Sequence, residues 1–131
     1  MKNCKAFLLL VICIVSFIAC NSNSSIDYIG MYEGVLPCED CDAIKAKLTL
    51  KEDQNYTLYE TYSAAEGDEI KRMSGKFEWE EEKGVFSIEQ VGAMPLYFKI
   101  MDNKIMHLNF KAEPFKDDQQ HILMKIESPE E

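Results

Sequence analysis

The stretch Ile44–Lys51 reads IKAKLTLK and the stretch Asn55–Tyr62 reads NYTLYETY, with only the polar tripeptide EDQ between them. In the first stretch every second side chain is apolar, and most of the others are lysine. A period of two is typical of a β-strand that buries one face and exposes the other. The short polar connection is turn-prone, so the two stretches predict a β-hairpin.

The same pattern continues in both directions from this hairpin. Short apolar-alternating runs are separated by turn residues, and no segment keeps a helical period over three turns. The connections at 81–84 and 102–103 are short and polar, whereas those at 64–69 and 113–120 are longer. The predicted strands lie at about Tyr28–Leu36, Ile44–Lys51, Asn55–Tyr62, Ile70–Trp79, Val85–Val91, Leu96–Met101, Lys104–Phe110 and His121–Ile126.

Consecutive strands without helices predict an all-β fold, a small up-and-down antiparallel β-barrel of about eight strands. Closure into a barrel removes the exposed edges that an open sheet of this length would have. With about eight strands, the interior is just wide enough for side chains to fill it or for one small ligand. A two-sheet sandwich is the alternative fold. The aromatic residues expected in the core are Phe77, Trp79, Phe86, Tyr97, Phe98 and Phe110.

The first twenty residues have the layout of a bacterial export signal. A lysine-containing start precedes an apolar stretch from Ala6 to Cys20, which is shorter than the roughly 20 residues that span a membrane. The sequence Phe17-Ile18-Ala19-Cys20 resembles a lipobox, which implies cleavage before Cys20 and lipidation of its thiol. Several acyl chains hold a protein stably on a membrane, whereas one chain gives only marginal binding. We therefore predict a lipoprotein signal peptide at 1–19, a lipidated tether at 20–27, one barrel domain at 28–126 and an acidic tail at 127–131.

Charge and cysteine usage narrow the range of functions that the domain can have. The net charge is −9, and removal of residues 1–19 takes two lysines away and leaves 12 basic against 23 acidic residues, a net charge of −11. Such an acidic domain argues against nucleic acid as a partner. Of the five cysteines, Cys4 and Cys13 leave with the signal and Cys20 carries the lipid, so Cys38 and Cys41 remain. Disulfides persist in the cell envelope.

The remaining pair lies in the segment Gly34–Ile44, GVLPCEDCDAI. A proline ends the first strand there, so the cysteines are expected in a tight connection at one rim of the barrel. Three interpretations stay open: a disulfide that clamps a four-residue loop, a soft-metal site in which two thiolates hold Cu(I), and catalytic thiol exchange. Exchange is the least favoured, because it requires a stabilised thiolate, and Glu39, Asp40 and Asp42 crowd the thiols.

This segment, with its Leu-Pro-Cys-x-x-Cys core, resembles the NlpE N-terminal domain family. The resemblance continues through Leu48–Lys51, Asn55–Leu58 and Gly75–Phe77, over roughly 28–126. It implies a lipocalin-like barrel, an outer-membrane lipoprotein, and a link to copper resistance or envelope stress, with Cys38 and Cys41 as the family's CxxC pair. Asp42-Ala43 departs from a glycine that members often have, and a second barrel present in some members has no counterpart here, so any role of that barrel is not carried over.

Other metal donors are expected to be structural. Met73, Met106 and Met124 have apolar spacing on strands, and methionine commonly fills gaps in cores. His107 and His121 lie on separate predicted strands and can meet only if those strands pair.

The main functional hypothesis is therefore a non-enzymatic lipoprotein, lipid-anchored to the outer membrane and facing the periplasm, that acts in copper homeostasis or envelope-stress sensing. The candidate cofactor is Cu(I), and the expected partners are the membrane and an envelope-stress signalling protein. The alternative is a small lipocalin-like module that binds an apolar ligand and has a structural disulfide at its rim.

Overall fold

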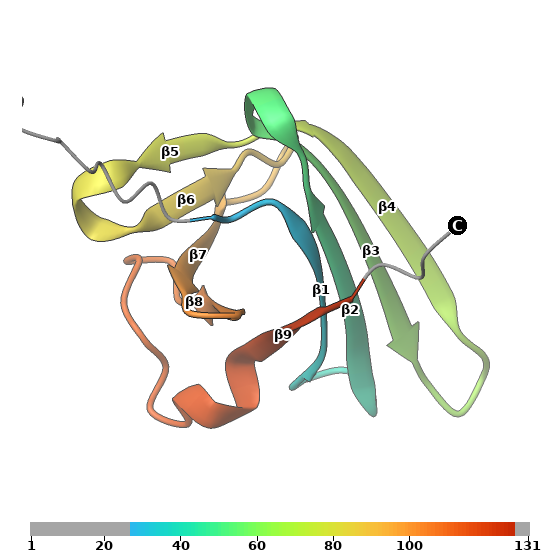
Figure 1. Cartoon of the computed structure of the whole chain (residues 1–131). Helices are drawn as coiled ribbons and strands as arrows, with labels where there is room; N and C mark the ends of the chain where they lie inside the picture. The colour runs from blue at the N-terminus through green and yellow to red at the C-terminus, as the bar shows by residue number, and fades with distance from the viewer. Residues whose placement is uncertain (1–26, 128–131) are drawn as a thin grey trace, which may run out of the picture.

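A computed structural model describes residues 27–127 of the chain (Figure 1). The predicted signal peptide, Cys20 and the last four residues lie outside the described residues. The described part contains nine β-strands and three short 3-10 turns. The strands are β1 (Gly30–Leu36), β2 (Ala43–Leu50), β3 (Asn55–Ser63), β4 (Glu69–Lys76), β5 (Glu78–Glu80), β6 (Val85–Ile88), β7 (Leu96–Met101), β8 (Lys104–Leu108) and β9 (Ile122–Ile126). The turns are η2 (Glu52–Gln54), η3 (Glu81–Lys83) and η4 (Asp118–His121).

All nine strands belong to one antiparallel sheet with the order β4-β3-β2-β1-β9-β8-β7-β6-β5. The pairing of β1 with β9 joins the two ends of the described chain, and every other pairing is between strands that are neighbours in sequence. The sheet curls into a nearly closed barrel (Figure 1). The predicted all-β meander barrel is confirmed.

The ninth strand arises because the predicted strand Ile70–Trp79 is divided at Phe77. Before this residue β4 pairs with β3, and after it β5 pairs with β6. The Phe77 amide donates to the carbonyl oxygen of Gln54 (2.9 Å), and only 2% of Phe77 is exposed. The buried ring therefore holds the chain at the point where it passes from one end of the sheet to the other. Counted as one bent strand, β4 and β5 restore the predicted number of eight.

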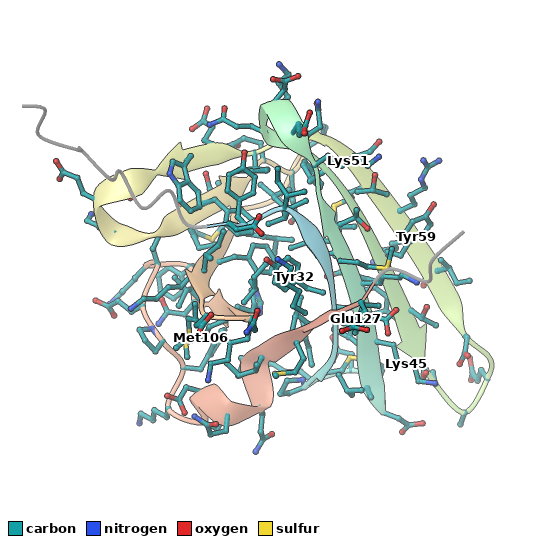
Figure 2. The ribbon with its side chains drawn as sticks, in the orientation of Figure 1. Tyr32, Lys45, Lys51, Tyr59, Met106 and Glu127 are labelled. Atoms are coloured by element: carbon teal, nitrogen blue, oxygen red, sulfur yellow. A yellow bond between two sulfur atoms is a disulfide. The ribbon has the colours of Figure 1, made fainter. Side chains whose placement is uncertain are left out.

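The alternation that predicted the hairpin decides which face is buried. Ala46, Leu48 and Leu50 are buried in the barrel, whereas Lys45 before them is exposed and Lys47 and Thr49 between them are half-buried. The main core is drawn from all strands of the barrel wall, and the largest of its buried side chains are Tyr32, Phe77, Phe86, Leu48, Leu50, Leu58, Ile88, Ile105 and Leu123. Tyr32 lies within the barrel in Figure 2.

A second, smaller cluster lies on the outer face of β6 and β8. It consists of Val85, Met106 and Leu108, with Ala112 and Ile122 packed against them. The long connection from 109 to 121 leaves the end of β8 and returns to β9, and it supplies Ala112 to this cluster. This connection therefore packs against the barrel wall.

Several expectations about single residues were wrong. Phe110 is not in the core: it is 62% exposed, because β8 ends at Leu108 and the chain turns away. Met124 is 53% exposed on the outer side of β9 and fills no core gap. His121 belongs to η4 and not to a strand. Within residues 27–127, no helix has the length and apolar character needed to cross a membrane.

Candidate functional site

The cysteine pair lies in the connection between β1 and β2. The first strand ends at Leu36 and the second begins at Ala43, which leaves residues 37–42 to reverse the chain. Cys38 and Cys41 are joined as a disulfide, with their Cα atoms 5.3 Å apart. The Asp42 amide donates to the carbonyl oxygen of Ser63 at the end of β3 (2.8 Å), so the connection is tied to a third strand. The predicted position at a rim of the barrel is confirmed.

The surroundings of the disulfide are acidic and open to solvent. Glu39, Asp40 and Asp42 are exposed, and both cysteines are half-buried. A half-buried disulfide beside solvent is accessible to a small thiol or to a reducing protein. The carboxylates would disfavour thiolates after reduction, which argues for slow exchange at this pair.

A buried acid lies in the barrel wall one row deeper than the cysteine connection. Glu60 on β3 is only 8% exposed, and its Oε2 atom accepts a hydrogen bond from the Tyr62 hydroxyl (2.7 Å). The Nζ atom of Lys71 lies 4.4 Å from the centroid of the Tyr62 ring. Burial, followed by the hydrogen bond to Glu60 and the charges of Glu60 and Glu69, raises the pKa of Tyr62 well above its ordinary value. The phenol therefore stays protonated and donates to the carboxylate.

Sequence reasoning did not single out Glu60. It shares the inward parity of Tyr56, Leu58 and Tyr62 on β3, and it is the only charged residue of this set. A carboxylate on an otherwise apolar face was the signal that could have found it.

The two histidines meet at the same end of the barrel. Strand β8, which carries His107, pairs with β9, and His121 is the last residue of η4, directly before β9. The centroids of the two imidazole rings lie 5.9 Å apart. Phe115, from the connection before η4, stacks on His121 at 3.8 Å with an interplanar angle of 8°. Phe98 lies on the other side of His107, at 5.2 Å. The predicted strand position of His121 was wrong, but the two histidines meet because η4 leads directly into β9, which pairs with β8.

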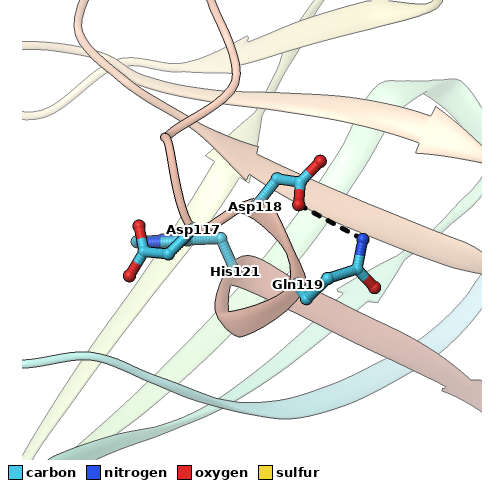
Figure 3. Close-up of polar contacts among 4 residues, drawn as sticks. All are labelled: Asp117, Asp118, Gln119 and His121. Carbon is cyan, nitrogen blue, oxygen red and sulfur yellow. Dashed lines mark hydrogen bonds and ion pairs between the residues drawn. The ribbon is translucent and has the colours of Figure 1, made fainter.

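The histidines are held differently. The Nε2 atom of His121 lies 3.6 Å from Oδ1 of Asp117, and Figure 3 shows both residues at η4, beside the hydrogen bond between Gln119 and Asp118. Burial, and secondarily the neighbouring His121, lowers the pKa of His107 to about 4. His107 is thus neutral at physiological pH and acts as an aromatic member of the core.

The arrangement does not complete a multi-ligand metal centre. Within residues 27–127, no three His, Cys, Asp or Glu side chains gather closely enough to hold a metal ion. The three methionines with apolar spacing do not gather on one face: Met73 packs against the main core, Met106 belongs to the outer cluster, and Met124 is exposed. In the described part of the chain, Cys38 and Cys41 would form a pair of soft ligands once reduced.

The end of the barrel remote from the disulfide is filled by aromatic rings. Phe77 lies 5.0 Å from Phe86 and 6.5 Å from Trp79, and Tyr28 lies 5.7 Å from both Phe77 and Trp79 (ring centroids). Phe86 continues the stack onto Phe98 at 5.2 Å. Rings at these separations pack against one another and leave the interior occupied. This filling counts against the alternative of a lipocalin-like module that holds an apolar ligand.

Fold and site together define a small antiparallel meander barrel with a disulfide-bonded CxxC hairpin at one rim. The chain belongs to the NlpE N-terminal domain family, whose profile matches residues 32–118. Among curated proteins, none matches the chain at a significant level.

Two crystal structures share the fold. A candidate lipoprotein from Shewanella oneidensis is 27% identical, with a TM-score of 0.69 over 79% of this chain and 94% of that one. The Cpx pathway activator NlpE from Escherichia coli is 18% identical, with a TM-score of 0.55 over 78% of this chain and 52% of that one. The chain thus spans about half the length of the Escherichia coli protein.

Proposed function

We propose that this protein is an NlpE-type lipoprotein of the bacterial outer membrane, anchored through Cys20, that takes part in envelope-stress sensing from the periplasmic side. Membership of the NlpE N-terminal domain family and the lipobox at Phe17–Cys20 support this proposal. The observation that carries it is the CxxC pair in the β1–β2 connection, tied to β3 and accessible at the rim. The Cys38–Cys41 pair acts as a redox-sensitive clamp, and an envelope-stress signalling protein reads its state.

Copper handling is a second role of the same pair. Two reduced thiolates on a four-residue loop can hold Cu(I), which prefers few, soft ligands. The disulfide and the copper complex are mutually exclusive, because the ion needs both sulfur atoms as thiolates. To pass from the disulfide to the Cu(I) complex, the pair needs two electrons from a dithiol protein of the envelope, which is itself oxidised to a disulfide. The two states of the pair then differ in charge as well as in covalent structure.

The redox role is tested by trapping thiols in living cells. Cells that express the full chain are quenched in acid, alkylated, and analysed by mass spectrometry before and after an oxidative or copper challenge. We expect the disulfide to dominate at rest and the ratio of the two states to change on challenge. A pair that stays fully reduced under all conditions would contradict the clamp.

The copper role needs a separate measurement. The reduced full chain is titrated with Cu(I) against a chelator of known affinity, beside a Cys38→Ser/Cys41→Ser double variant. Loss of binding in the double variant is the expected result. Equal affinity in both proteins would eliminate the pair as the copper ligand and leave the redox role standing.

The anchor is tested by Cys20→Ser. We expect unprocessed protein that no longer incorporates a labelled fatty acid and leaves the outer-membrane fraction. Unchanged processing and lipid labelling would refute the assignment of Cys20.

A further inference from the structure

The barrel wall opens along one side of β4. This strand pairs with β3 on one side, and it stands at the end of the sheet order. At Phe77 the chain turns into β5, which pairs with β6. In Figure 1, β4 runs away from this junction along the margin of the molecule, while β5 and β6 run to the opposite side. The wall is therefore joined near Phe77 and parts toward Glu69, at the end of the barrel that carries the disulfide.

The parted edge is long and unprotected. All eight residues of β4 except Met73 are exposed. Among the described residues, the ladder of β4 runs only to β3, so the other edge presents free N–H and C=O groups. The connection after β6 approaches the edge from inside, where Gln90 Nε2 lies 3.6 Å from Met73 Sδ. An edge of this length is a template for an added strand.

Exposed apolar side chains flank the edge. Ile70 on β4 is 68% exposed, and Tyr59, next to β4 on β3, is 40% exposed. Single exposed apolar residues are ordinary, but Ile70 and Tyr59 lie on adjacent strands beside an open strand edge, which is typical of an interaction site.

The charge of β4 itself is opposite to that of the whole molecule. The chain carries a net charge of −9, whereas β4 has Lys71, Arg72 and Lys76 against Glu69 alone. Arg72 lies over the Tyr59 ring, 5.6 Å from its centroid. Among residues 27–127, no carboxylate pairs with the three basic side chains of β4 at ion-pair distance. These charges attract an acidic segment and, together with the acidic remainder of the chain, do not favour the pairing of β4 with itself.

We propose that the free edge of β4 binds an extended acidic segment of a partner protein, which adds to the barrel wall as a strand. Side chains of an added strand alternate between the two faces of the sheet. On the outer face the positions beside Ile70 and Arg72 follow each other at a spacing of two residues. The segment that fits has an apolar side chain at one of these positions and a carboxylate at the other. This binding does not depend on the chemistry of the cysteine pair.

A lysine-rich edge also has a protective role, because edge lysines hinder aggregation. If the basic residues of β4 only hinder aggregation, no strand adds to this edge. The two roles are distinguished by whether a complementary peptide is bound at this edge.

The test uses the purified full chain and an eight-residue peptide that alternates glutamate and valine, with a peptide that alternates lysine and valine as its control. Affinity is measured by calorimetry at low and high salt, and the bound site by amide hydrogen exchange. We expect binding of the acidic peptide only, weakening with salt, with new protection of β4 amides. The variant Arg72→Glu should lower the affinity at least tenfold, whereas Lys99→Glu, an exposed charge reversal on β7, should leave it unchanged.

The proposal is overturned if neither peptide binds or if both bind equally. It is also overturned if protection appears elsewhere than on β4, or if Lys99→Glu loses as much affinity as Arg72→Glu. A concentration-dependent dimer that protects β4 without any peptide would show a second copy of the chain as the occupant, and would also refute it. Circular dichroism of Arg72→Glu confirms that the variant is folded, and if it is not, Ile70→Glu replaces it with the same expected loss.

Discussion

Acid should destabilise this barrel through one buried histidine. His107 lies among Phe98, Phe115 and His121, and burial lowers its pKa to about 4. In the unfolded chain the imidazole has a pKa of about 6.5. Between these two values the unfolded state binds a proton that the folded state does not. The contribution of the neutral His107 to the free energy of unfolding is therefore complete above pH 6.5, falls as the pH decreases, and is lost near pH 4.

The magnitude follows from the difference between the two values. Each pH unit in this interval changes the free energy of unfolding by about 1.4 kcal/mol, so the decrease from pH 7 to pH 4.5 is about 2.5 kcal/mol. Such a loss is a large part of the stability of a domain of this size, which is typically about 5–15 kcal/mol.

The pH-dependent contribution of His107 is measured by urea denaturation of the native chain and of His107→Leu at several pH values. The variant keeps every carboxylate, so the difference between the two pH profiles isolates the histidine. We expect the native chain to lose about 2.5 kcal/mol more than the variant between pH 7 and pH 4.5. Parallel profiles, or a His107 ring that titrates near pH 6.5 by NMR, would refute the reasoning.

Three further outcomes follow from the structure. Phe77→Ala removes the buried ring at the junction and should lower the free energy of unfolding by about 3–5 kcal/mol in urea titrations, whereas Phe110→Ala, on an exposed ring, should change it by less than about 0.5 kcal/mol. Gly34→Ala places a methyl group against the backbone carbonyl of Ile122 at the start of β9, and a loss of about 1–3 kcal/mol with faster amide exchange in β1 is expected; unchanged exchange would contradict the close approach. Replacement of Cys38 and Cys41 by serine should lower the stability by no more than about 2 kcal/mol in thermal melts, because the bond closes only a four-residue loop; a larger loss would show that the disulfide organises more than its own hairpin.

Much of the fold could be predicted because its signals are local. The alternation in Ile44–Lys51 reports which side chains face the core, and the structure buries the apolar set. The ends of the strands were harder to predict from the sequence. Phe110 is an apolar residue in an apolar run, and it is exposed only because the chain turns away after Leu108.

The candidate site was likewise predictable only in part. The cysteine pair follows a proline and is surrounded by charged, turn-prone residues. These neighbours alone are enough to predict that the pair lies in a connection between strands. Glu60 and Tyr62 were not found as a pair, because their contact depends on the side-chain conformations inside the barrel.

The sequence by itself determined the β-class, the order of the strands, the rim position of the cysteine pair, and the prediction of a lipid anchor at Cys20. Each depends on a few neighbouring residues, whose spacing and chemistry act over one strand or one turn. Only the tertiary structure decided that β1 closes on β9, that His107 meets His121, and that the bend at Phe77 leaves β4 with an open edge. These features depend on register and curvature summed over the whole sheet, and no local segment carries that information.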